Sequence, residues 1–330
     1  MGIKLYLSDF APRDIVHEAF DGIKERTMTQ LSANVDFSLT FINENTLRIF
    51  VRSAPADEGQ WRYEVVITNR LYDLITGCFF ILASCIPSVN GCDIPSATDF
   101  TDLPPFNPST QNIEQRISEV SNEIEIDDQR IDLFFDFIRE AWVLLIFHEL
   151  AHITAGHLRF MESDRARWEA NSAYSRACEY EADDLAAKWI MKRAVLNAPV
   201  WRRGAEIREN LTSPSPQFSC LVVSVLFLAV RVRTDVENDD YLPSEVRHLM
   251  MIMAIGNAVN WPSQEARIEE TFHYMTEATR LLDMVVGMPP SDKPIIVTDF
   301  DPDYQEKIVE QVHQEYLALS HEWQGFAFRK

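Results

Sequence analysis

The sequence lacks several features that define other classes of protein. It has only 10 glycines in 330 residues, which argues against a glycine-rich β-sandwich or an extended linker architecture. Its five cysteines form no Cys-x-x-Cys pair, so a zinc site built from thiolates is not expected. The cysteine count is odd and several cysteines lie in apolar runs, which fits a reducing compartment.

Basic side chains are scarce. The chain has 30 lysines and arginines against 51 aspartates and glutamates, giving a net charge of −21. Such a surface repels the phosphates of DNA and RNA, so nucleic acid is excluded as the expected partner.

Long apolar runs are also missing. The best candidates are Leu74–Ile86, Phe218–Val230 and Leu249–Val259, all shorter than the roughly 18–20 residues that cross a bilayer. The first residues show no signal-peptide pattern of charged and then apolar segments. We therefore expect buried helices, no membrane span and a cytoplasmic location.

The residues that are present divide into a short strand-rich part and a long helical part. Residues 34–53 alternate as two strands around a turn, residues 62–68 form a third strand, and a helix follows over about 69–86. Residues 87–112 are rich in Pro, Ser, Asp and Asn and predict a long loop. Further helices are expected at about 128–158, 177–195, 218–232, 244–260, 264–286 and 303–326.

This layout predicts an α+β fold that is predominantly helical, with a small N-terminal sheet, antiparallel or mixed. The expected division is 1–112, an N-terminal helix and small sheet with the long loop, and 113–330, a helical body. No linker separates the two parts, so one compact domain is expected overall.

The stretch LLIFHELAHITAGH carries the chemistry. His148 and His152 are four residues apart, so a helix places both on one face with Cβ atoms about 5–6 Å apart. Two imidazoles at that spacing can bind one Zn²⁺. Glu149 points off the ligand row but can reach a water on the ion, which makes it the expected general base. The apolar run before His148 buries the helix, and buried polar groups are costly without partners.

A catalytic zinc needs a third protein ligand. His157 does not fit a metzincin, because it lies nine positions after His148 instead of ten, and Ala155 stands where a metzincin has Gly. We expect His157 to be a buried histidine at the end of the helix.

The segment RACEYEADDLAA supplies a better third ligand. Glu179 and Asp183 are four residues apart and share a helical face. Glu179 can ligate zinc while Asp183 hydrogen-bonds the outer nitrogen of a ligating histidine. Glu181 is a weaker alternative on another face, and we expect it on a solvated surface.

HELAHITAGH followed by EYEADDLAA resembles the gluzincin metallopeptidases of the M48 type and their minimal cytosolic relatives, the phage-exclusion protease Lit and the ImmA/IrrE regulators. The resemblance covers about residues 147–187. It implies a zincin-type helical body with one Zn²⁺, in which Glu179 is the third ligand, Glu149 the general base and Asp183 the partner of a ligand. Asp183 favours the M48 and Lit side, since ImmA/IrrE proteins usually have Asn there.

Many of these relatives carry a later His-Pro-Ser stretch followed by Arg. YLPSEVRH, residues 241–248, resembles it, with Leu242 in place of the His. Arg247, Tyr241 and His248 are therefore candidates for stabilising the transition state.

The expected function is a zinc-dependent endopeptidase acting on a protein or peptide substrate, with a role in stress or phage defence suggested by the resemblance to Lit. Two alternatives stay open: a repressor-cleaving regulator of the ImmA/IrrE type, and a noncatalytic interaction protein that zinc stabilises.

Overall fold

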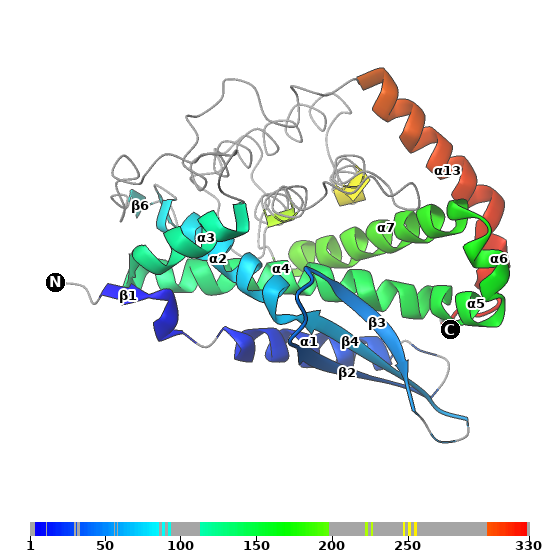
Figure 1. The fold of residues 1–330 in the computed structure, drawn as a ribbon, viewed down its shortest axis with the longest axis horizontal. Coiled ribbons are helices and arrows are strands. Elements are labelled where there is room, and N and C mark those ends of the chain that lie inside the picture. The colour runs from blue at the N-terminus through cyan, green and yellow to red at the C-terminus, as the bar shows by residue number, and fades with distance from the viewer. Residues whose placement is uncertain are drawn as a thin grey trace.

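The computed structural model describes four main stretches of the chain. These are most of residues 4–85, two short strands at 88–89 and 92–93, residues 113–197, and residues 302–328. A few single positions between 222 and 255 are described as well. Figure 1 shows the arrangement, with the described elements as coloured ribbons.

Short strands and helices make up the N-terminal part, and long helices follow. The strands are β1 (Lys4–Tyr6), β2 (Val35–Ile42), β3 (Ile49–Ala54), β4 (Trp61–Thr68), β5 (Ser88–Val89), β6 (Cys92–Asp93) and β7 (Glu125–Asp127). The helices are a 3₁₀ turn at Leu7–Asp9, α1 (Arg13–Met28), α2 (Asn69–Cys85), α3 (Ile113–Glu123), α4 (Asp128–Ala155), α5 (His157–Ser163), α6 (Arg165–Glu169), α7 (Ser172–Asn197) and α13 (Pro302–Gln324). The predicted class, α+β with mostly helices and small N-terminal sheets, is confirmed.

The main sheet has three strands in the order β2-β4-β3. β4 runs parallel to β2 and antiparallel to β3, so the sheet is mixed. The prediction of two strands around a turn is right for the strands but wrong as a hairpin, because β4 lies between them. The physical reason is burial: the last four residues of β4 are all buried, and a strand covered in this way belongs at the centre of a sheet.

Helices α4 and α7 pack side by side through the middle of the molecule (Figure 1). α1 packs against α4, α2 packs against α3 and α4, and α13 packs along α7. One large cluster of buried apolar side chains joins the strands, α1, α2, α3, α4 and α7. The helix that carries the HELAH sequence therefore lies in the core.

α4 ends at Ala155, three residues earlier than expected, because Gly156 interrupts it. Gly156 has φ 91°, a left-handed conformation that side chains disfavour. A Cβ there would lie 2.6 Å from the backbone carbon of Phe326, so only glycine lets the end of the described chain approach. The amide of Phe328 donates to the carbonyl of Thr154 at 3.1 Å and closes this contact.

Several expectations fall largely outside the described residues. These include most of the 87–112 loop, where only the short β5–β6 pair is described, and most of the helices expected within 218–286. The described single positions in that last region are helical. The boundary at residue 112 stays a prediction. Among the described residues, no helix is both long and apolar enough to cross a bilayer.

Candidate metal centre

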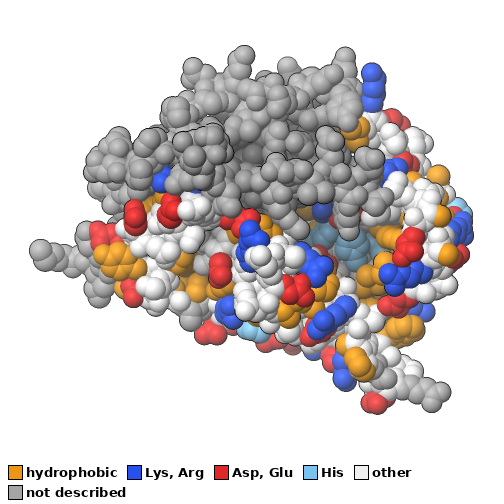
Figure 2. Space-filling model, viewed as in Figure 1, with side chains coloured by type: hydrophobic (Ala, Val, Ile, Leu, Met, Phe, Trp, Pro, Cys, Tyr) orange, Lys and Arg blue, Asp and Glu red, His pale blue; other side chains and the backbone are white. Residues whose placement is uncertain are grey.

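The second half of α4 supplies two imidazoles from a rigid support. Trp142, Ile146 and Leu150 are fully buried in the core on this helix. His148 and His152 stand on the adjoining face, with side chains 11% and 14% exposed. Figure 2 shows histidine side chains, in pale blue, recessed between their neighbours on the face drawn. Because the core fixes the backbone, the two rings are held in place before any ligand arrives.

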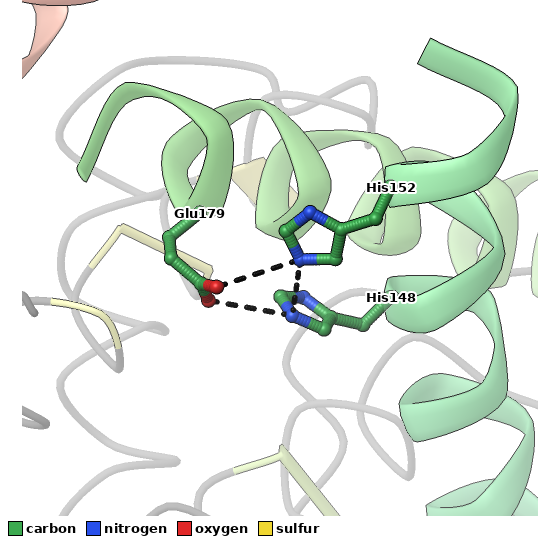
Figure 3. Close-up of side chains that lie close together, drawn as sticks. All are labelled: His148, His152 and Glu179. Atoms are coloured by element: carbon green, nitrogen blue, oxygen red, sulfur yellow. Dashed lines mark hydrogen bonds and ion pairs between the residues drawn. The ribbon is translucent and has the colours of Figure 1, made fainter. Parts of the chain in front are cut away.

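Glu179 on α7 completes a group of three donors (Figure 3). The Nε2 atoms of His148 and His152 lie 3.1 Å apart. The Glu179 carboxylate places Oε2 3.4 Å from the first nitrogen and Oε1 3.5 Å from the second. The expected third ligand therefore lies opposite the histidine pair.

These three separations fit a tetrahedral metal ion. Bonds of about 2.0–2.1 Å to a tetrahedral zinc place neighbouring ligand atoms about 3.3–3.4 Å apart. The two imidazole nitrogens are 3.1 Å apart, and each has one carboxylate oxygen at 3.4 or 3.5 Å, close to that value. One ligand atom from each of the three residues lies within 4.8 Å of the other two. Two imidazole nitrogens and one carboxylate are also the ligand types of catalytic zinc sites with an open fourth position. The residues present thus fit Zn²⁺ in both geometry and chemistry.

Asp183, one turn beyond Glu179 on α7, lies behind His148. Its Oδ1 is 2.8 Å from the Nδ1 of His148, and its side chain is 1% exposed. Arg247 donates to both of its carboxylate oxygens, at 2.9 and 2.8 Å. The same guanidinium lies 3.0 Å from Oε2 of Glu179. The structure therefore places Asp183 against the outer nitrogen of His148 and Arg247 against both carboxylates.

The charges of the site favour a cation between the carboxylates. Burial raises the pKa of Glu179 and Asp183, but Arg247 and His148 lower both pKa values overall, and His152 also lowers that of Glu179. For His148, burial lowers the pKa, yet Asp183 and Glu179 raise it overall to about 10. Burial lowers the pKa of His152 to about 3. Both carboxylates stay ionised, and a positive charge beside them is stabilised.

Glu149 lies between His148 and His152 in the sequence and is 7% exposed. Burial raises its pKa to about 7, and Glu179 adds to this while His148 opposes it. Within the described part of the chain its carboxylate makes no hydrogen bond or ion pair. A buried carboxyl group with a pKa near neutrality can both accept and return a proton.

His157 is buried next to the end of α4, as expected. The sequence did not anticipate that its Nδ1 lies 3.0 Å from the Nδ1 of His152, and one expectation beside it needs correction. Its Nε2 lies 3.0 Å from Oε2 of Glu181. Glu181 also accepts a hydrogen bond from Trp323 at 2.8 Å and is 12% exposed, so placing it on a solvated face was wrong.

Of the three residues proposed to stabilise the transition state, the structure describes one. Arg247 is described and lies at the site. Tyr241 and His248 are outside the described residues. Trp323 was not anticipated, and no local motif marks it, because α13 approaches α7 from far along the chain.

The comparisons with known proteins identify the class. The model of the family Peptidase U49 matches residues 106–279, more than half of the chain. The chain belongs to this family, which is Lit-like, and is a peptidase with a protein substrate. The matched segment contains His148, Glu149, His152, Glu179 and Asp183. No curated protein and no solved structure matches the chain.

Proposed function

We propose that this peptidase is a zinc-dependent endopeptidase, with His148, His152 and Glu179 as the ligands and Glu149 as the general base. The observation that carries the proposal is the meeting of two imidazole nitrogens and one carboxylate, with contacts of 3.1–3.5 Å between them, beside a buried carboxyl group. The family match supports the peptidase class, and the ligand geometry supports the metal.

Zn²⁺ held by these ligands would supply Lewis-acid chemistry, lowering the pKa of a water molecule and polarising the peptide carbonyl. Glu149 accepts the proton of the attacking water and passes it to the nitrogen of the leaving amine. Its raised pKa, about 7, suits both transfers near neutral pH.

Arg247 and Asp183 prepare the ligands in this proposal. Asp183 holds the Nδ1 side of His148, which leaves Nε2 directed at the metal. Arg247 fixes the Glu179 carboxylate. A guanidinium beside the ligands could also stabilise negative charge that develops on the carbonyl oxygen. This role of Arg247 in the transition state stays a prediction, as do those of Tyr241 and His248.

We also propose that the chain is related to the M48-type and ImmA/IrrE peptidases. A role in stress or phage defence is part of the same proposal. The substrate is a protein cut at internal peptide bonds.

The deciding experiment compares cells expressing wild type and Glu149→Gln by mass spectrometry of newly formed protein termini. We expect wild type to generate specific termini that are absent with Glu149→Gln. Metal analysis of the purified proteins should find one zinc in wild type and Glu149→Gln, and none in His148→Ala.

Two outcomes would contradict the proposal. Identical termini from both proteins would favour a noncatalytic zinc protein, since that alternative needs no general base. Cleavage by wild type without any bound metal would refute the ligand assignment.

A further inference from the structure

A row of hydrogen-bonding groups leads away from the metal centre behind His152. The His152 Nδ1 lies 3.0 Å from Nδ1 of His157, whose Nε2 lies 3.0 Å from Oε2 of Glu181. The indole nitrogen of Trp323 donates to that same oxygen at 2.8 Å. His157 and Trp323 are each 1% exposed, so the row is shielded from water.

The direction of these hydrogen bonds follows from the groups at the two ends. The indole N–H of Trp323 can only donate, so Glu181 accepts. The ionised carboxylate accepts again from Nε2–H of His157, and in a neutral imidazole this leaves Nδ1 of His157 as an acceptor. His152 must then carry its proton on Nδ1, and the lone pair on Nε2 faces Glu179 and His148, where the metal would be held.

The two ligand histidines are therefore held in different ways. His148 contacts the carboxylate of Asp183 directly at 2.8 Å, whereas His152 reaches the carboxylate of Glu181 through the ring of His157. The rings along the row also pack edge to face: the His152 and His157 centroids are 5.1 Å apart, and the His157 and Trp323 centroids 5.4 Å apart. The position of the His157 ring is thus fixed by packing as well as by hydrogen bonds.

We propose that His157, Glu181 and Trp323 are positioning residues that fix the tautomer and orientation of His152 for metal binding. The proposal rests on the zinc site proposed above. It brings α13 into the site, and Trp323 lies outside the segment that the family model matches. Outer partners of metal-bound histidines typically change metal affinity about 10–100-fold when they are removed.

The test measures zinc affinity of the purified full chain by competition with a chromophoric chelator. His157→Phe keeps an aromatic ring at this position but removes both nitrogens. We expect it to weaken zinc binding about 10–100-fold. His157→Gln should recover most of this loss, because an amide can accept from His152 and donate to Glu181. Trp323→Phe should weaken binding severalfold.

Trp168→Phe is the matched control. Trp168 belongs to the same aromatic cluster, with its ring stacked on Tyr174, but makes no contact with Glu181 among the described interactions. We expect its zinc affinity to equal that of wild type. A loss of equal size in Trp168→Phe and Trp323→Phe would overturn the proposal, since general loosening of the cluster would explain both.

The remaining outcomes distinguish a failure of the positioning role from a failure of the proposed zinc site. Wild type that binds no zinc contradicts the proposed function. Wild type that binds zinc, with His157→Phe within threefold of it, overturns only the positioning role. An equal loss in His157→Phe and His157→Gln also overturns it, because lost packing would then be the cause. If His157→Phe does not fold, Trp323→Phe against Trp168→Phe decides.

Discussion

Asp183 is a buried carboxylate that contacts both Arg247 and His148. It accepts two hydrogen bonds from Arg247 and lies 2.8 Å from His148, in a place with almost no access to water. A buried ion pair contributes little net stability, but losing one partner leaves the other charge buried and uncompensated.

We predict that Asp183→Asn lowers the free energy of unfolding by about 3 kcal/mol. It should also weaken zinc binding about 10–100-fold, because the outer partner of His148 loses its charge. Denaturant unfolding and chelator competition measure the two effects.

Asp184→Asn provides the control on the same helix. Asp184 pairs with Lys188 at 2.6 Å on the surface, where such a pair contributes about 1 kcal/mol or less. Equal destabilisation by the two substitutions would contradict the assigned role of Asp183.

For single residues, the sequence predicts which side chains share a helical face, but it does not predict contacts between residues far apart in the chain. Helical spacing alone places His148 and His152 on one face of their helix. The same spacing places Glu179 and Asp183 on one face of theirs. Glu181 was misplaced because its environment is set by Trp323, 142 residues further on. A helical period identifies a face but cannot say which distant element covers it.

At the scale of elements, the break between α4 and α5 sets the direction of the chain after His148 and His152. Gly156 combines a positive φ with a close approach to the backbone of Phe326. The positive φ disfavours any residue with a Cβ, and the close approach leaves no space for one.

We predict that Gly156→Ala destabilises the protein by more than about 2 kcal/mol, because the left-handed conformation and the overlap both contribute. Gly59→Ala, which has φ 80° in open space, should cost only about 1 kcal/mol. Gly22→Ala, within α1 and with open space around it, should stabilise by about 0.5–1 kcal/mol. Equal costs for Gly156→Ala and Gly59→Ala in denaturant unfolding would disprove the close approach.

The contact of α13 with α7 should depend on pH. Burial raises the pKa of Glu315, but hydrogen bonds from Arg176 and Gln311 lower it overall. Because the folded pKa lies below the unfolded one, the stabilisation is complete above the unfolded value of about 4.3 and is lost as the pH falls through the folded pKa.

We therefore predict that Glu315→Gln is less stable than wild type at pH 6–7, about two units above that unfolded pKa, and that the difference shrinks below about pH 4. Urea unfolding across this range measures it. Glu310→Gln, on the exposed face of the same helix, is the control for removing a carboxylate away from Arg176. A difference that stays constant with pH would argue against the ion pair with Arg176.

The order of strands shows a second limit of sequence reasoning. Alternation and composition located β2, β3 and β4 closely, and the helix after β4 begins and ends within a residue or so of its expected bounds. The parallel pairing of β2 with β4 was missed because a strand pattern carries no information on which neighbour it pairs with. Only the heavier burial of β4 marks it as the central strand.

For the whole molecule, the proposed ion joins the two central helices. His148 and His152 belong to α4 and Glu179 to α7. A ligand that binds only the folded state raises its stability by about 2.7 kcal/mol at 100 times its dissociation constant.

We predict that a chelator in excess lowers the melting temperature of wild type by about 5 °C, and that added zinc restores it. His148→Ala should melt at one temperature with or without chelator. Calorimetry or circular dichroism gives the measurement, and a wild-type melting temperature insensitive to both reagents would argue against a structural link through the metal.

The distribution of the site along the chain has a consequence for how the protein is made. The helix that bears His148 and His152 can form locally, but Glu179 reaches them only when α7 docks, and Trp323 only when α13 does. Because closing long loops costs entropy, we expect the contact with Trp323, far along the chain, to form after the local helices. A newly synthesised or partly unfolded copy would then hold two imidazoles and no complete proteolytic centre. If the proposed zinc centre carries the activity, cleavage would begin only after these helices have docked, and neighbouring chains would be protected during synthesis.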